Sequence, residues 1–427
     1  MSSSTRQQQA VPDFRAGGAA QGQLRCAARH STGTRTRKVV FGAVIAASLC
    51  VLPQGWAGRD LPPASPVPRA SAIERISTML EQIRARYVEP IDDDKLVADA
   101  LNGVLKGLDP YSKYMNPEAY EQLQNQNRGE YGGLGLEVRM EQSGARVNST
   151  FDDAPAQRAG LQPGDLVTRI DDTSLEGMTL EQVTERMRGK PDTEITLSVV
   201  RKGRTDTESL KIKRAIVRWQ SVRGSLIEPG IAYLRITNFQ EHTGEMLAGA
   251  IAKLWHDHDG PMQGIVLDLR DNPGGLLSSA VSVGSAFVEE GPIVTEWFGE
   301  NDQTVFESDG TYAGITVPIV VLVNEGSASA SELISAAMQD TGAATIIGER
   351  TFGKGTVQTW HELSNGGGLR LTVARWISPS GRWIHERGVV PDTLVMWNPT
   401  GVEGERDPQL DYAIGVIEGQ TPGVSAQ

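Results

Sequence analysis

Three closely spaced serines and a downstream lysine are the residues of this sequence best suited to covalent chemistry. Ser327, Ser329 and Ser331 alternate with alanine between the apolar run 318–323 and a helical pattern. Lys354 follows between two glycines. A serine hydroxyl is a weak nucleophile until a base takes its proton, and a lysine can be that base where its site keeps it neutral. The pattern therefore indicates acyl transfer by a Ser–Lys pair without a histidine.

The three serines differ in their fitness for the nucleophile role. Ser331 lies beside the expected helix start, where a serine commonly acts as the N-cap. Ser329 falls at the apex of a corner made of small residues, which lets a substrate backbone approach closely. We predict Ser329 as the nucleophile and Lys354 as its base, with Gln358 placed to accept a hydrogen bond from the amine. Burial would lower the pKa of this lysine. Taken alone, the serine segment could equally be caps and turns.

An acyl-transfer site also needs N–H groups directed at the developing oxyanion. The paired glycines Gly274 and Gly275 follow an expected strand, Gly264–Leu269, and precede an expected helix. The amide of Ala330 comes directly after Ser329 and near a helix N-terminus, which also favours negative charge. These amides are the candidate oxyanion donors, and a plain turn is the alternative for the glycine pair.

A glycine-rich loop points to a second, separate activity. The loop 132–137 enters an expected strand, and the segment 154–167 carries an Ala-Gly-Leu-Gln-Pro-Gly-Asp turn before an amphipathic helix that starts at Thr179. Glycines ahead of a sheet edge leave N–H groups free to hold a carboxylate, so that an extended peptide can add as a strand. The order of loop, turn and helix resembles a PDZ domain.

That resemblance implies a set of peptide-binding residues. Leu134, Gly135 and Leu136 would hold a C-terminal carboxylate through their backbone. Val183 and Met187, one turn apart on the helix, would line a pocket for an apolar last side chain. Ordinary core packing is the alternative for these two residues.

The remaining patterns divide the chain into regions that position these motifs. Helical periodicity occupies the region before the glycine-rich loop, short strands follow, and strands then alternate with helices, which suggests an α/β layer fold. The two amphipathic helices of the first region are too small for a core of their own and should pack on a neighbour or a second subunit. The predicted regions are a leader (1–57), a linker (58–69), a helical region (70–127), a PDZ domain (128–216), a catalytic core (217–396) and a tail with a short helix (397–427).

The start of the chain predicts export. Basic residues precede an apolar run, Val39–Leu52, and a small-x-small end closes at Ala57, as in a secretory signal peptide. A retained membrane anchor is the alternative. Both cysteines, Cys26 and Cys50, fall within this leader, so the exported chain depends on no disulfide or thiolate site. The predicted location is the periplasm or cell envelope.

Composition excludes other classes of protein. With 427 residues the chain can form two or three domains, and its formal net charge of −12 argues against nucleic acid as a partner.

The segment His256–Asp259 has no second ligand group nearby, so we predict no metal and no cofactor. A Ser-His-Asp triad has little support because the other histidines are isolated. The rival functions are a non-catalytic peptide-binding scaffold and, less favoured, a crotonase-like enzyme acting on thioesters.

Five segments together resemble the carboxyl-terminal processing peptidases, also called tail-specific proteases. They are LDPYSKYM (108–115), LRDNPGG (269–275), GSASASE (326–332), GERTFGKGTVQ (348–358) and the segment from SPSGRWI to GVVPD (378–392). The resemblance implies a multidomain α+β chain with a helical segment, a PDZ domain and a core related to the Clp protease and crotonase folds. It also implies serine endopeptidase activity on proteins with apolar C-terminal tails, dimers, and in some members an adaptor protein.

Residue by residue, the same resemblance implies roles within the core. Ser329 is the nucleophile, Lys354 the general base and Gln358 its orienting partner. Gly275 and Ala330 supply the oxyanion amides, and Gly274 remains a contender.

Overall fold

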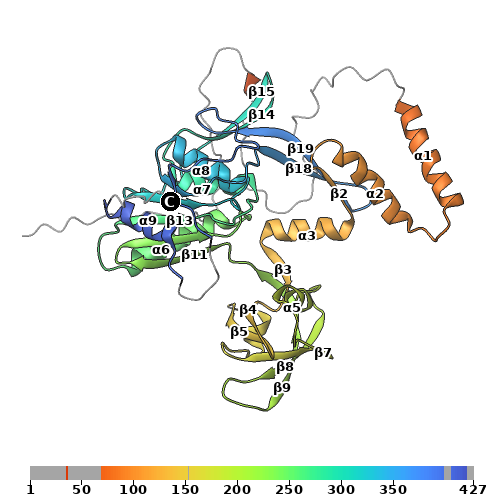
Figure 1. Cartoon of the computed structure of the whole chain (residues 1–427), viewed down its shortest axis with the longest axis horizontal. Coiled ribbons are helices and arrows are strands. Elements are labelled where there is room, and N and C mark those ends of the chain that lie inside the picture. Colours follow the sequence, from red (N-terminus) through yellow and green to blue (C-terminus); the bar gives the residue numbers. More distant parts are fainter. Residues whose placement is uncertain (1–34, 37–68, 152, 399–404, 421–427) are drawn as a thin grey trace, which may run out of the picture.

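A helical segment, a small β-rich module and a large α/β core occupy separate parts of Figure 1. The computed structural model describes residues 35–36, 69–151, 153–398 and 405–420. The predicted multidomain α+β fold class is confirmed. The predicted leader lies outside the described residues apart from β1 (Arg35–Thr36), which pairs with β15. No helix within the described ranges has both the length and the hydropathy to cross a membrane.

A six-stranded sheet forms the centre of the large core. Its order is β11-β12-β13-β16-β17-β20, in which β11 is antiparallel to β12 and all other neighbours are parallel. Parallel strands covered on both faces are continuously apolar, and every residue of β13 and β16 is buried. The bounds are β11 (Val222–Glu228), β12 (Ile231–Ile236), β13 (Gly264–Asp268), β16 (Ile319–Val323), β17 (Thr345–Gly348) and β20 (Thr393–Leu394).

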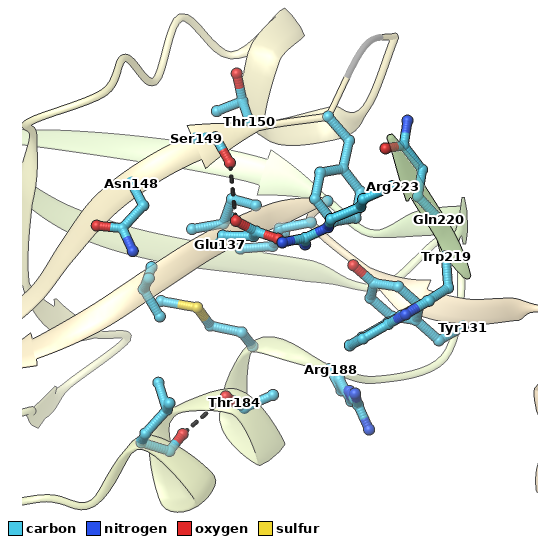
Figure 2. A pocket seen from close by; sticks show the side chains of 17 residues that line it. Tyr131, Glu137, Asn148, Ser149, Thr150, Thr184, Arg188, Trp219, Gln220 and Arg223 are labelled. Atoms are coloured by element: carbon cyan, nitrogen blue, oxygen red, sulfur yellow. Dashed lines mark hydrogen bonds and ion pairs between the residues drawn. The ribbon is translucent and has the colours of Figure 1, made fainter. Parts of the chain in front are cut away.

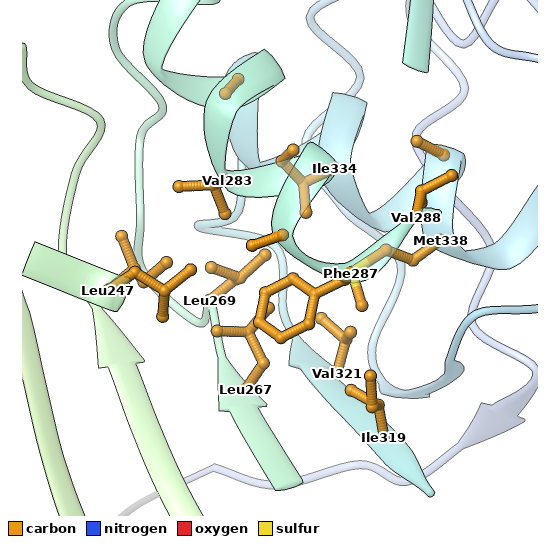
Figure 3. Close-up of a cluster of buried hydrophobic side chains, with 14 of the residues drawn as sticks. Leu247, Leu267, Leu269, Val283, Phe287, Val288, Ile319, Val321, Ile334 and Met338 are labelled. Carbon is orange, nitrogen blue, oxygen red and sulfur yellow. The ribbon is translucent and has the colours of Figure 1, made fainter. Parts of the chain in front are cut away.

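Three helices cover one face of this sheet: α6 (Thr243–Asp257), α7 (Leu277–Phe287) and α8 (Ala330–Asp340). Successive strand residues point to opposite faces, so Leu267 and Val321 face these helices. Figure 3 shows their side chains around the ring of Phe287. The alternate residues of β13 and β16 pack instead with α9 (Pro408–Ile417) on the other face. The core is therefore a three-layer arrangement that holds the ends of β13 and β16 in place.

A buried ion network ties α9 to the end of β13. Arg270 lies 2.7 Å from Asp268 and 2.8 Å from Asp407, and it donates to the side chain of Gln409 at 3.0 Å. Its guanidinium also stacks over the ring of Trp397, 5.1 Å from the centroid. Although burial opposes ionisation, the arginine partners hold the pKa of Asp268 below its ordinary value. Arg270 thus links the C-terminal helix to the loop that begins at residue 271.

A second sheet lies beside the first and is antiparallel apart from its edge strand β1. Its order is β1-β15-β14-β19-β18, and β2 also pairs with β19. The pairing of β18 with β19 shifts register between Val357 and Gln358, an irregularity that re-aims side chains. Because β2 comes from the N-terminal segment, that segment is built into the core. The bounds are β2 (Lys113–Met115), β14 (Pro292–Gly299), β15 (Asp302–Glu307), β18 (Thr356–Glu362) and β19 (Gly368–Ile377).

The β-rich module has its own sheet and its own apolar core. Its entering and leaving strands, β3 (Glu130–Gly133) and β10 (Ala215–Arg218), pair with each other and close the module. Thr179 caps the helix α5 (Leu180–Met187) through a capping box with Gln182. The other elements are β4 (Leu136–Glu141), β5 (Gly144–Thr150), α4 (Pro155–Arg158), β6 (Leu166–Ile170), β7 (Thr173–Ser174), β8 (Glu194–Val200) and β9 (Thr207–Lys213).

The helical segment consists of α1 (Arg69–Arg86), α2 (Asp93–Lys106) and α3 (Pro117–Arg128). Figure 1 shows α1 and α2 extending away from the large core. Asp92 and Asn116 cap α2 and α3 through their side chains. Apolar side chains on α1, α2 and their flanking turns are exposed, as expected for helices that lack a partner: Ile73, Ile76, Met79, Tyr87, Val88, Val97, Leu101, Val104 and Leu108.

Candidate active site

The three candidate serines have different tasks in the corner between β16 and α8. Ser327 is fully buried and donates to the carbonyl of Leu269 at 2.8 Å. Ser331 is also fully buried and donates to the carbonyl of Asn272 at 2.8 Å. The N-cap of α8 is Ser329, not Ser331 as the sequence suggested, because the helix begins one residue after the apex. Ser329 is the one of the three that lines a cleft.

Ser329 holds an uncommon backbone conformation for a residue with a side chain. Its φ is 56° and its ψ −113°, in a region that costs on the order of 1–3 kcal/mol. Its N–H donates to the carboxylate of Glu332 at 2.7 Å, which holds the strained turn. A strained strand-to-helix turn is also the way in which other hydrolases present a nucleophilic serine.

One buried carboxylate joins the serine corner to the lysine loop. Besides the Ser329 N–H, Glu332 accepts from the hydroxyl of Thr351 at 2.6 Å and from the N–H groups of Gly353 at 2.6 Å and Lys354 at 2.8 Å. Burial raises the pKa of Glu332, and these four donors oppose that rise. Sequence analysis missed this residue, although the Ser-x-x-Glu spacing of a capping box was there to be read.

Replacing Glu332 with glutamine is expected to destabilise the core by about 2–4 kcal/mol, because an amide offers one acceptor oxygen where four donors converge. Urea unfolding of the Glu332→Gln variant would measure the change in free energy. The matched control is Glu325→Gln, which alters an exposed acid in the same corner. Equal unfolding midpoints for the two variants would show that the four hydrogen bonds carry no net stability.

Two tryptophans hold the backbone of the lysine loop. The indole N–H of Trp376 donates to the carbonyl of Lys354 at 2.9 Å, and that of Trp383 donates to the carbonyl of Gly355 at 2.9 Å. Burial and, after it, the positive charge of Arg370 lower the pKa of Lys354, while Glu332 and Asp109 act in the opposite direction. A lowered pKa is what a general-base lysine requires.

The cleft lined by Ser329 has a volume of about 630 Å³ and also contains Lys354 and Gln358. We call it the Ser329 cleft. No hydrogen bond within the described part of the chain joins Lys354 to either of the other two. The amide nitrogen of Gln358 donates instead to the hydroxyls of Thr356 at 2.9 Å and Thr372 at 3.3 Å. The structure thus brings the three predicted residues into one cleft without connecting them.

The glycine loop lies directly beside Ser329 and also lines the Ser329 cleft. The N–H of Gly274 donates to the side chain of Asn272 at 2.9 Å, so this amide already has an acceptor. The amides of Gly275 and Ala330 donate no hydrogen bond within the residues that the structure describes, and both residues line the cleft. A Cβ atom on Gly274 would lie 2.8 Å from the Cβ of Ser329, so only glycine permits this approach. The geometry favours Gly275 over Gly274 as a donor.

Apolar side chains, including those of Leu277, Phe306, Leu333 and Val357, also line the Ser329 cleft. Glu296 lies among them, and burial raises its pKa to about 7. Sequence analysis did not single out this residue, because an isolated acid in a strand carries no local signal of a cleft.

The predicted peptide-binding residues divide between groove and core. A groove of about 570 Å³ in the β-rich module, the PDZ-like groove, is lined by Leu134, Gly135, Leu136 and Met187. Val183 does not line it, which corrects the prediction: its side chain is fully buried in the core of the module. The residues α5 presents to the groove are Leu180, Thr184 and Met187.

Figure 2 shows polar and aromatic side chains around the PDZ-like groove. Glu137 accepts from the hydroxyl of Ser149 and pairs with Arg223, a residue of β11 in the large core. The guanidinium of Arg188 lies over the ring of Tyr131, 5.3 Å from the centroid. Burial raises the pKa of Tyr131 to about 12, so its hydroxyl stays protonated. The groove is therefore bounded by both the module and the core.

Family models match three parts of the chain. They are described as Peptidase family S41 (residues 230–395), PDZ domain (residues 122–200) and Activating protease CtpB N-terminal domain (residues 63–119). The first two matches contain most of the residues that line the Ser329 cleft and the PDZ-like groove, respectively.

Known proteins resemble most of the chain. A carboxy-terminal-processing protease of Bartonella bacilliformis is 40% identical over 368 residues, which cover 84% of this chain and 82% of the relative. The carboxy-terminal processing protease CtpA of Bacillus subtilis is 34% identical over 322 residues, covering 75% and 68%. A solved photosystem II D1 C-terminal processing protease is 30% identical, covering 75% and 86%, with a TM-score of 0.45.

The family models and the two sequence relatives define a serine-type peptidase with a PDZ domain. The chain belongs to peptidase family S41, and the relatives that it matches there are carboxy-terminal-processing proteases. This agrees with the resemblance in the sequence and sets aside the non-catalytic scaffold and the crotonase-like enzyme.

Proposed function

We propose that the protein is an exported endopeptidase that binds the C-terminal tail of protein substrates in the PDZ-like groove and cleaves them with Ser329 and Lys354. The observation that carries the proposal is the Ser329 cleft itself. It contains a strained serine, a lysine of lowered pKa, and the amides of Gly275 and Ala330, which donate no hydrogen bond to any described residue. These are the parts that acyl transfer needs.

The reaction follows from these groups. The neutral amine of Lys354 takes the proton of the Ser329 hydroxyl while the serine oxygen bonds to the substrate carbonyl carbon. The oxyanion that forms accepts from the N–H groups of Gly275 and Ala330. The lysine then gives its proton to the leaving amine, and water attacks the acyl-enzyme by the reverse steps. Gln358, on the adjoining strand, orients the amine once the lysine turns toward the serine.

A mechanism-based label tests the proposal directly. A fluorophosphonate probe reacts only with an activated serine, so we expect one adduct, on Ser329, in the folded protein and none after unfolding. Peptide mapping by mass spectrometry locates the adduct. In the Lys354→Met variant, labelling should fall to the unfolded level. An adduct on Ser327, or equal labelling of parent and variant, would contradict the assignment.

Tail binding can be measured apart from cleavage. Leu180 lines the PDZ-like groove and is 47% exposed, so Leu180→Asp places a charge there at little cost to folding. We expect about tenfold weaker binding of a peptide with an apolar C-terminus, which corresponds to about 1.4 kcal/mol. Fluorescence polarisation in a Ser329→Ala background would report it. Asp substitution at Leu226, 37% exposed and outside the groove, is the control. Equal affinities would place the tail elsewhere.

The exposed apolar side chains of α1 and α2 are proposed to pack on a second copy of the chain. Ile76 and Met79 are 48% and 51% exposed. Clusters of exposed large apolar side chains are uncommon on monomeric proteins and often mark an interface. Sedimentation equilibrium should give a dimer for the parent and a monomer for Ile76→Lys. A monomeric parent would argue against the second copy and leave an adaptor protein as the occupant.

Export is proposed on the basic flank and apolar run that end at Ala57. N-terminal sequencing of the protein recovered from cells would report the first residue. A start after Ala57 supports removal of a leader, whereas a start before Val39 supports a retained anchor.

A further inference from the structure

The aromatic ring of Tyr111 makes a cation–π contact with the Lys354 side chain. The ammonium nitrogen lies 5.0 Å from the ring centroid. No hydrogen bond or ion pair joins that nitrogen to another residue in the described ranges. Tyr111 comes from the turn between α2 and β2, far from Lys354 in the sequence. The N-terminal segment therefore reaches the proposed catalytic amine.

The ring is held in this place by its turn. The carboxylate of Asp109 accepts from the N–H groups of Tyr111 at 2.7 Å and Ser112 at 2.8 Å, and from the Ser112 hydroxyl at 2.6 Å. Arg370 donates to the carbonyl of Tyr111 at 2.8 Å, and Thr372 donates to Asp109 at 3.1 Å. Both come from β19, which pairs with β2. The position of the ring is thus built into the sheet.

The groups around the Lys354 amine shift its pKa in opposite directions, so a contact with the Tyr111 ring can decide its protonation state. Burial and then Arg370 lower the pKa of Lys354, while Glu332 and Asp109 raise it, and in the described residues neither carboxylate forms an ion pair with the amine. His385, edge-on to Tyr111 at 6.5 Å, and Glu386 are the other titratable groups near the ring. The face of an aromatic ring attracts an ammonium group but not a neutral amine. Tyr111 therefore favours the protonated lysine where burial disfavours it.

We propose that Tyr111 is a positioning residue that holds the protonated Lys354 side chain over its ring, apart from Ser329, until the amine releases its proton. The inference rests on the proposed role of Lys354 as the base. When the proton passes to water, the attraction to the ring ends. The neutral amine is then free to turn and accept the proton of the Ser329 hydroxyl. Tyr111 thereby sets the pH at which the dyad assembles.

The test compares side chains that differ in the ring face. Tyr111→Phe keeps an aromatic ring, and Tyr111→Leu keeps apolar volume without a ring. Tyr111→Trp provides a ring with a stronger cation–π attraction. Competitive trace acetylation across pH, in a Ser329→Ala background, measures the pKa of the Lys354 amine without any cleavage. We expect Phe to match the parent, Leu to lower the value by about one unit and Trp to raise it. Urea unfolding confirms that each variant is folded.

Equal pKa values for the folded Phe, Leu and Trp variants would overturn the proposal. A second readout separates it from the proposed function. In the active enzymes, the acid limb of the kcat/KM profile should shift to lower pH by the same amount in Tyr111→Leu. A shift in acetylation without a shift in the profile would support the contact with Tyr111 and refute Lys354 as the base. No shift in either would refute the contact.

Discussion

Ser329→Ala is expected to lower kcat/KM for an apolar-tailed peptide by about 10⁴- to 10⁶-fold, the loss seen when a serine nucleophile is removed. The reason is that alanine has no oxygen to form the acyl-enzyme, while the amides of Gly275 and Ala330 remain. Binding of the tail should persist, because the PDZ-like groove shares no residue with the Ser329 cleft. Cleavage would be followed by mass spectrometry of the product termini.

Ser278→Ala is the matched control for this experiment, since Ser278 is an exposed serine of the same cleft. It should retain most of the activity. A similar loss in both variants would mean that the cleft, and not one hydroxyl, is sensitive to substitution. Full activity in Ser329→Ala would remove this serine from the mechanism.

Lys354→Met and Lys354→Arg are both expected to lose at least 10³-fold in kcat/KM, although arginine keeps the positive charge. Arginine cannot act as a base, because its pKa lies far above working pH. An arginine variant with near-parent activity would show that charge alone suffices and that no proton is transferred to this side chain.

The pH dependence of the parent enzyme should also reflect the lowered pKa of Lys354. Burial lowers the pKa of Lys354 below its ordinary value of 10.5, so the neutral fraction grows as pH rises and becomes dominant at a pH below 10.5. We expect kcat/KM to rise about tenfold per pH unit on the acid side and then to level off. Stopped assays from pH 5 to pH 10 would record the profile. A flat profile would contradict a titrating base.

Short motifs gave much of the candidate site in advance. The strand, small-residue corner and helix around Ser329 could be read from an apolar run followed by alanines and serines, because tight corners restrict side-chain size. The glycine loop with Gly274 and Gly275 could be located for the same reason, because its glycines lie against Ser329. The structure adds that Gly274 is already engaged by Asn272, a side-chain contact that spacing alone does not reveal.

Other features depend on tertiary packing and could not be read locally. Val183 and Met187 are one helical turn apart and both pack in the core of the module, but of the two only Met187 also lines the groove. The contact between Tyr111 and Lys354 requires β2 to pair with β19. Residue periodicity does not predict the pairing of strands so far apart in the sequence. Glu332 is different, because its capping-box spacing was visible and was overlooked.

The order in which the chain is synthesised affects when Arg270, the buried residue directly before the glycine loop, finds its ion-pair partners. Arg270 pairs with Asp268, the last residue of β13, and with Asp407, the N-cap of α9. Translation supplies Asp407 after every residue that lines the Ser329 cleft. A nascent chain therefore contains Ser329 and Lys354 before the carboxylate of Asp407 is available to pair with Arg270. The ion network around Arg270 can therefore form completely only after all residues of the Ser329 cleft have been synthesised.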